Sequence, residues 1–193
     1  MSLKKTTSPA KPKILITGAA GRIGSTLRSA WASEGRYDLT LLDSNKIDSE
    51  IIQVDIRQTD QMKIVCQNQD VLVHLANIRY QDILKDPAQM TDITASMLLF
   101  ETARQAGISK IIYASTNHVT GWNEKLAQPS DGSWTGVPPV VSTADQFRPD
   151  GWYGAMKGMA ELAGRYLVDA YQIQFTSLRI GSFNGTSQPK NIR

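Results

Sequence analysis

The sequence predicts an α/β fold built on a doubly wound parallel sheet, and three observations support this prediction. Short apolar runs alternate with longer segments of helical periodicity, which is the pattern of parallel βαβ units. The first apolar run, at residues 14–16, is followed by glycines at positions 18, 21 and 24 and then by a helix-forming segment. The chain of 193 residues, 41% hydrophobic and 20% charged, is also large enough for one domain with a substantial core.

The elements follow one another in a regular order. Residues 1–12 are rich in Ser, Thr, Lys and Pro, so we expect a disordered basic tail, with a single folded domain at residues 13–193. Buried strands are expected where apolar residues cluster, at residues 14–16, 39–42, 51–54, 70–75, 110–114 and 175–180. Helices are expected at residues 23–34, 60–67, 87–106 and 151–171, and residues 122–149 read as a loop. Gly35 and Gly107 each stand where a helix should end.

Composition excludes several kinds of protein. The net charge of +3 and the sequence pI of about 9.0 come largely from the N-terminal lysines, and basic and aromatic residues are not interleaved as in nucleic-acid grooves. No apolar run approaches the length of a membrane span. The single cysteine, Cys66, allows no disulfide within the chain and no cysteine metal cluster, so we expect a buried thiol, no bound metal and a cytoplasmic location.

The three glycines predict a phosphate-binding turn. Gly18 lets the chain turn sharply out of the strand, Gly21 leaves room for a pyrophosphate at the backbone, and Gly24 lets the helix lie close to the strand. The N–H groups and the dipole at the start of that helix favour a phosphate. Asp43 ends the second strand, where a carboxylate can bind the adenosine ribose hydroxyls and repel a 2′-phosphate, which favours NAD over NADP. The alternative is that Asp43 merely opens the turn after its strand.

Later strand ends supply the other expected contacts, since ligands bind outside the carboxyl ends of such strands. Residues 55–56 follow the third strand and could flank the adenine, whereas residues 75–77 follow the fourth and could run beside the pyrophosphate. His74 is in line with its strand, so a histidine of the core or surface is favoured over a ligand.

Two stretches carry residues for proton transfer. Tyr153 and Lys157 lie four residues apart, on one face of a predicted helix. An ammonium beside a phenol favours the phenolate and lowers its pKa, and the same lysine could hold the nicotinamide ribose. Ser115 and Thr116 follow the fifth strand, where their hydroxyls could bond a substrate oxygen.

Together these motifs resemble the extended short-chain dehydrogenases/reductases, in the NAD-dependent epimerase/dehydratase branch. The motifs are Thr17-Gly-Ala-Ala-Gly-Arg-Ile-Gly24, His74-Leu-Ala-Asn77, Ala114-Ser-Thr116 and Tyr153-Gly-Ala-Met-Lys157, with Asp43 and Asp55. Within that branch, Thr116-Asn-His118, Arg148-Pro-Asp150 and Arg179-Ile-Gly-Ser182 are similar to segments of the uronate dehydrogenases.

The resemblance implies a Rossmann fold and a role for each site residue. It makes Thr116, Tyr153 and Lys157 the catalytic residues: the hydroxyl that polarises the reacting oxygen, the base and its activator. It implies NAD contacts from Gly18, Ala20, Gly21, Arg22, Ile23, Gly24, Asp43, Asp55, Ile56, Leu75, Ala76, Asn77, Ser115, Tyr153, Lys157 and Ile180. It implies contacts with a sugar or sugar-acid substrate from Arg79, Thr116, Asn117, His118, Tyr153, Ser182 and Arg193.

The sequence also departs from that family pattern. Thr116 stands where the uronate enzymes have serine, and Arg79 stands where they have another serine, either as an anion anchor or as a solvated loop residue. Family members continue past residue 193 into a segment that caps the substrate, so the cap is short or missing here. The chain is then either a truncated form or a compact member with an incomplete pocket.

These residues are compatible with three functions. The leading hypothesis is NAD-dependent oxidation of the C1 hydroxyl of a hexuronate to a lactone. The second is a nucleotide-sugar epimerase or dehydratase, although Asn117-His118 replaces the Asp-Glu pair typical of dehydratases. The third is an NAD-binding regulatory module without catalysis. The resemblance also implies a homodimer paired through helices 87–106 and 151–171, whose extra apolar residues could instead line the core.

Overall fold

The computed structural model describes residues 10–77, 91–127 and 141–184, and the side chains of residues 91–93 are outside that description. Within this part of the chain, six strands form one parallel sheet in the order β3-β2-β1-β4-β5-β6. The strands are β1 (Lys13–Thr17), β2 (Asp38–Asp43), β3 (Ile51–Gln53), β4 (Val71–His74), β5 (Lys110–Thr116) and β6 (Gln174–Ile180). The order reverses between β1 and β4, as in doubly wound dinucleotide-binding sheets, which confirms the predicted fold class.

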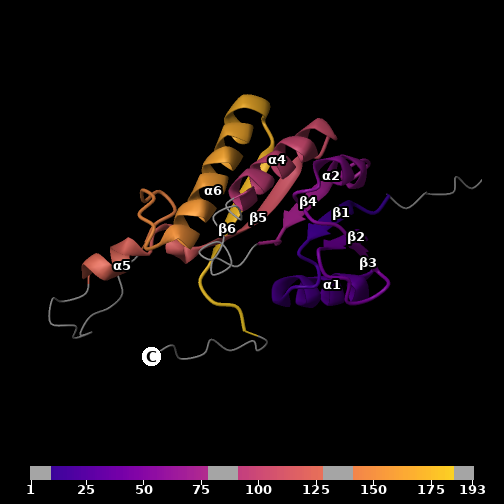
Figure 1. Cartoon of the computed structure of the whole chain (residues 1–193), viewed down its shortest axis with the longest axis horizontal. Helices are drawn as coiled ribbons and strands as arrows, with labels where there is room; N and C mark the ends of the chain where they lie inside the picture. The colour runs from indigo at the N-terminus through magenta and orange to yellow at the C-terminus, as the bar shows by residue number, and fades with distance from the viewer. Residues whose placement is uncertain (1–9, 78–90, 128–140, 185–193) are drawn as a thin grey trace, which may run out of the picture.

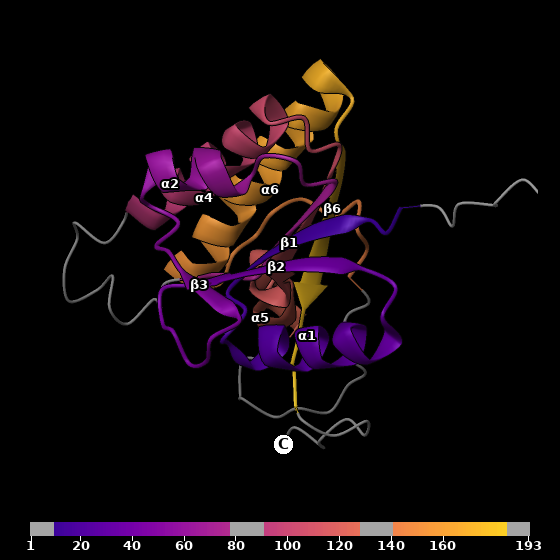
Figure 2. The same cartoon turned by 90° about the vertical axis from the view of Figure 1, so that its right-hand side faces the viewer.

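Helices cover the two faces of this sheet, as the views along and across it show (Figures 1 and 2). They are α1 (Arg22–Glu34), α2 (Thr59–Val65), α4 (Thr91–Gln105), α5 (Trp122–Ala127) and α6 (Trp152–Tyr171), with a 3₁₀ turn, η2 (Asn117–Val119), after β5. In Figure 2, α1 lies below the strands, whereas α2, α4 and α6 lie above them. The segment at residues 122–127, expected to be loop, is instead the short helix α5. None of the helices in the described ranges is long and apolar enough to cross a bilayer.

Two hydrophobic clusters explain the layers. Alternate strand residues point to opposite faces, so Leu15 of β1 packs towards α4 and α6 with Phe100 and Leu167, whereas Ile14 and Ile16 pack towards α1. Cys66 lies fully buried in the first cluster, as expected, and burial raises the pKa of its thiol to about 11.

The topology brings the polar residues at the strand ends to one edge. Thr17 of β1 pairs in register with His74 of β4, and Thr116 of β5 pairs with Ile180 of β6. Because all six strands are parallel, their carboxyl ends meet at the same edge, and the candidate residues of the sequence lie along it.

Candidate active site and nucleotide cleft

The glycine-rich turn between β1 and α1 has the geometry that its sequence predicts. Gly18 has φ +74°, and a Cβ there would lie 2.6 Å from the Ala76 backbone nitrogen. A Cβ on Gly24 would overlap the Gly18 carbonyl oxygen, so a side chain at either position would separate the turn from its neighbours. These two glycines therefore allow the loop after β4, the turn and α1 to pack against one another.

The start of α1 fits a phosphate. Its N-cap is Gly21, no side chain among the described residues caps the helix, and the first turn carries no acidic residue. The N–H groups of Arg22, Ile23 and Gly24 open this helix, and N–H groups in a first turn have no partner within their own helix. An anion is the natural partner for such a terminus.

Asp43 connects the end of β2 to this turn. Its Oδ2 accepts the Ala20 N–H at 3.0 Å, and its Oδ1 accepts the Asn45 N–H at 2.9 Å. The carboxylate thus faces the glycine turn and also closes its own loop, whereas its contact with the adenosine ribose stays a prediction.

A cavity of about 650 Å³ lies beside these residues. This volume is in the usual range for small-molecule and cofactor sites. The predicted cofactor residues that line it are Gly18, Ala20, Gly21, Asp43, Asp55, Ile56, Leu75, Ala76 and Asn77. The residues that line the cavity therefore fit a nucleotide cofactor.

Arg57 also lines this cavity, and the sequence reasoning did not find it. Its Nε lies 2.9 Å from Asp55 Oδ1, and the guanidinium holds the pKa of the Asp55 carboxyl below its usual range. Arg57 lines the same cavity as Asp43, although the two residues are distant in the sequence. The one sign of its role in the sequence is that it lies two residues after Asp55.

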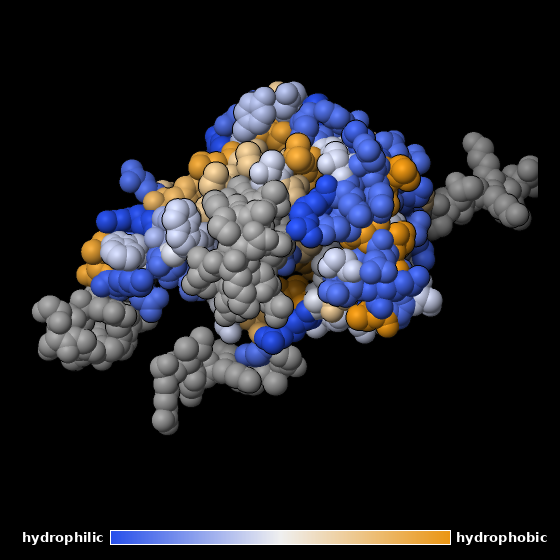
Figure 3. Space-filling model, in the orientation of Figure 1, coloured by the Kyte–Doolittle hydropathy of each residue, from blue (hydrophilic) through white to orange (hydrophobic). Residues whose placement is uncertain are grey.

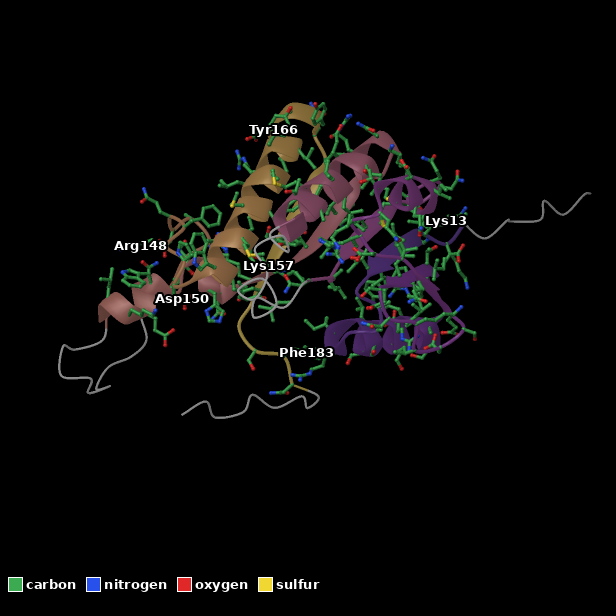
Figure 4. The ribbon with its side chains drawn as sticks, viewed as in Figure 1. Lys13, Arg148, Asp150, Lys157, Tyr166 and Phe183 are labelled. Atoms are coloured by element: carbon green, nitrogen blue, oxygen red, sulfur yellow. The ribbon has the colours of Figure 1, made fainter. Side chains whose placement is uncertain are left out.

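The second part of the site lies between β5 and α6. Tyr153 in the first turn of α6 lies near Thr116 at the end of β5, and the Thr116 hydroxyl acts to lower the Tyr153 pKa. Lys157, one turn further along α6, is buried, and its Nζ donates to the Ala114 carbonyl oxygen at 2.9 Å, with the Tyr113 ring centroid 4.7 Å away. The three predicted catalytic residues thus lie around the end of β5 and the start of α6, where Figure 4 labels Lys157.

The electrostatics of Tyr153 differ from the expectation. Burial raises the pKa of Tyr153, and only the hydrogen bond from Thr116 opposes that rise. The expected lowering of this pKa by Lys157 is not found, because the Lys157 ammonium is directed to the Ala114 carbonyl and the Tyr113 ring.

Ser115 occupies the opposite side of β5. Its hydroxyl donates to the buried carboxylate of Glu161, which also binds the Arg179 guanidinium at 3.0 Å. Successive strand residues point to opposite faces, so Thr116 meets Tyr153 whereas Ser115 turns to this network. A contact between Ser115 and the cofactor stays a prediction. Sequence reasoning missed the pairing of Ser115 with the buried Glu161 and of Glu161 with Arg179.

His74 is buried, as the core interpretation expected. One ring nitrogen, Nδ1, lies 2.7 Å from the Thr17 hydroxyl, and Nε2 lies 3.0 Å from the Ser96 hydroxyl of α4. Burial, helped by the Lys157 charge, lowers the pKa of His74 to about 3, so the ring is neutral. His74 thus joins β1, β4 and α4 beneath the nucleotide cleft.

The expected substrate contacts lie around the end of β5. Asn117 and His118 form the exposed η2 turn, Ile180 ends β6 beside Thr116, and Ser182 follows it, exposed. Arg79 and Arg193 lie outside the described residues. The roles assigned to all these residues stay predictions.

Comparison with known proteins places this geometry in a family. The model of the NAD dependent epimerase/dehydratase family matches residues 14–192. The chain belongs to this family. The strand order, the glycine turn and the cleft of this epimerase/dehydratase-family chain agree with the NAD dependence that the family description states.

Curated relatives of this family member act on sugars. L-arabinose 1-dehydrogenase (NAD(P)(+)) of Haloferax volcanii is 30% identical over 88% of this chain and 66% of its own length. Uronate dehydrogenase of Pseudomonas syringae is 27% identical over 100% of this chain and 66% of its own length. The chain therefore spans slightly less than two thirds of the length of these relatives.

A solved structure of the same family superposes on this fold. Uronate dehydrogenase from Agrobacterium tumefaciens matches with a TM-score of 0.72 and 27% identity, over 89% of this chain and 61% of that one. A mutant of that enzyme complexed with NAD matches with a TM-score of 0.69 and 25% identity, over 86% of this chain and 59% of that one.

Proposed function

We propose that this epimerase/dehydratase-family chain is the nucleotide-binding and catalytic part of an NAD-dependent dehydrogenase that oxidises the C1 hydroxyl of a hexuronate to a lactone. The observation that carries the proposal is the meeting of Tyr153, Thr116 and Lys157 at the carboxyl end of β5. The names of the relatives, three uronate dehydrogenases among them, support the sugar-acid substrate.

Each residue has a defined task in this proposal. Bound NAD supplies the acceptor for the hydride that leaves C1. Tyr153, as phenolate, takes the proton of the C1 hydroxyl, while the Thr116 hydroxyl donates a hydrogen bond to the same oxygen. Lys157 fixes its ammonium beneath the site, where it holds the nicotinamide ribose and favours the phenolate once the nucleotide covers the cleft.

The cofactor preference follows from the cleft. The Asp43 carboxylate faces the glycine turn, where an added 2′-phosphate would meet its negative charge. Arg57 does not reverse this preference, because its guanidinium is neutralised by Asp55. We therefore expect NAD to be used in preference to NADP.

Substitution of Tyr153 by phenylalanine tests the mechanism. NADH formation from galacturonate, glucuronate and L-arabinose is followed by absorbance, and Tyr153→Phe is expected to lower kcat by about 10²- to 10⁴-fold, the usual share of a general base. Tyr166→Phe, an exposed tyrosine on the same helix, is the matched control and should keep the parent rate. Equal rates for Tyr153→Phe and the parent would refute the mechanism.

The same assay separates the other functions. An epimerase would be purified with NAD tightly held and would interconvert nucleotide sugars without net NADH formation. A regulatory module would bind NAD and transfer no hydride to it from any sugar. Either result would replace the dehydrogenase proposal.

We also propose that the chain forms a homodimer through α4 and α6. Of the apolar residues that α6 carries beyond one buried face, four are exposed, whereas Met156 belongs to the core. The exposed set, with its continuation on α4, is Met97, Leu98, Trp152, Met159, Leu162 and Tyr166. Figure 3 shows apolar side chains among polar ones over this side of the molecule. Such a surface favours burial against a second copy, and a monomer in light scattering at micromolar concentration would contradict it.

A further inference from the structure

A histidine–aspartate pair lies beside Tyr153. Both carboxylate oxygens of Asp150 approach Nδ1 of His118, at 2.9 and 3.0 Å. The His118 ring meets the Tyr153 ring edge-on, with the two centroids 5.9 Å apart. Asp150, labelled in Figure 4, precedes α6 by two residues, so the pair joins the turn after β5 to the start of the helix that carries Tyr153.

The surrounding backbone holds this pair in place. The Asp150 N–H donates to the His118 carbonyl oxygen at 3.3 Å, and the Arg148 N–H donates to that of Val119 at 2.9 Å. Gly121 and Gly154 leave the room that the pair requires, since a Cβ on the first would overlap the Asp150 carboxylate and one on the second the His118 carbonyl. The contact thus joins two residues that are 32 positions apart in the sequence.

The chemistry of the pair follows from which ring nitrogen is bonded. A carboxylate is only an acceptor, so Nδ1 of His118 carries hydrogen and Nε2 is left to accept a proton. Among the described residues, the other charged and titratable groups with a contact to the pair are Tyr153 from α6 and Lys125 from α5, whose Nζ lies 3.4 Å from the Asp150 carbonyl oxygen.

The side chains around this pair differ in their exposure to solvent. The His118 side chain is 49% exposed, whereas Tyr153 is half-buried and Lys157 is buried against the Ala114 carbonyl oxygen. The imidazole is therefore the more exposed of the two neighbouring rings.

We propose that His118, positioned by Asp150, carries the proton between Tyr153 and solvent. The inference rests on the dehydrogenase function proposed above. The proton of the substrate hydroxyl bonds to the phenolate oxygen of Tyr153, and the phenol then gives a proton to Nε2 of His118, directly or through one water. The imidazolium then releases its Nε2 proton to solvent. Asp150 is a positioning residue, because it acts through His118.

Chemical rescue tests the relay. In a weak non-nucleophilic buffer, His118→Ala is expected to lower kcat by about 100-fold, and added imidazole should restore the rate in proportion to its concentration, because it fits the space of the lost ring. Asp150→Asn should lower kcat about tenfold with the Michaelis constant for NAD unchanged. The matched control is Asp169→Asn, which removes an exposed carboxylate paired with Arg165 on the same helix and should keep kcat.

The readouts separate the relay from other roles of His118. Loss of a substrate contact alone would raise the Michaelis constant for the sugar acid and would not respond to imidazole. A structural role alone would lower the melting temperature equally in the presence and absence of imidazole. Either result in an active wild-type protein overturns the relay and leaves the dehydrogenase in place.

Two further outcomes complete the test. A wild-type protein that binds NAD but oxidises no sugar acid overturns the proposed function and the relay with it. Independently of turnover, ¹⁵N NMR of the two histidines should show hydrogen on Nδ1 of His118 in the wild type and a mixture of tautomers in Asp150→Ala. A mixture already present in the wild type would overturn the positioning role of Asp150.

Discussion

Replacement of Glu161 by alanine is expected to destabilise this protein by about 3 kcal/mol. The Glu161 carboxylate, buried on α6, ties three elements together: it accepts the Ser115 hydroxyl of β5 and the Arg179 guanidinium of β6. Arg179 approaches it through Nη2 at 3.0 Å and through Nε at 3.2 Å from both oxygens. Alanine removes every one of these acceptors.

The magnitude follows from the burial of the partner left behind. Removal of one member of a buried ion pair costs about 3–5 kcal/mol, because the remaining charge loses its partner in a poorly solvated place. The Arg179 side chain is 20% exposed and its guanidinium lies 5.1 Å from the Phe147 ring centroid, so water can reach part of the charge and we expect the lower end of that range. The Ser115 hydroxyl also loses its acceptor in Glu161→Ala, which adds to the loss of stability.

Urea and thermal denaturation measure this loss. For a domain of this size, about 3 kcal/mol corresponds to a fall in the melting temperature of about 6–12 °C. Asp169→Ala is the control, since it breaks an exposed pair with Arg165 on the same helix and should cost no more than about 0.5 kcal/mol. A Glu161→Leu, Arg179→Met double variant should recover much of the loss, because two apolar side chains leave no buried charge. A loss in Glu161→Ala no larger than in the control would refute the reasoning.

Two more predictions concern the cleft. Burial lowers the pKa of His74 from 6.5 to about 3, so on acidification the unfolded chain binds a proton before the folded chain does. The contribution of the neutral ring to the free energy of unfolding is therefore fully present above about pH 6.5. Below that pH the free energy of unfolding falls by about 1.4 kcal/mol per pH unit. Melting curves at pH 7.5 and 5.5 should show this drop, and His74→Gln should reduce it; an unchanged slope would contradict the assignment. Gly18→Ala should weaken NAD binding at least tenfold in a titration, since Cβ would strike Ala76. Gly107→Ala is the control, because Gly107 has φ +89° and no described neighbour within 4 Å. Alanine there adds backbone strain without a clash, so this variant should bind NAD as the parent does.

The sequence determined the sheet and the two local motifs. Short apolar runs such as residues 14–16 must be buried, and the spacing of Gly18, Gly21 and Gly24 predicts a sharp turn directly after the first strand. Tyr153 and Lys157 share a helix face because of their spacing of four residues. The short helix α5 was missed, because its six residues carry too little periodicity to distinguish them from loop.

Only the tertiary structure decided which side chains meet across the chain. The pairing of His118 with Asp150, 32 residues apart, and of Ser115 with Glu161, 46 residues apart, depends on how α6 lies on β5. The same packing turned the Lys157 ammonium to the Ala114 carbonyl, whereas the pairing of β3 with β2 brought Arg57 to the cavity that Asp43 also lines. Local propensity is encoded in consecutive residues, whereas these contacts arise when parallel crossovers bring distant segments to one edge of the sheet.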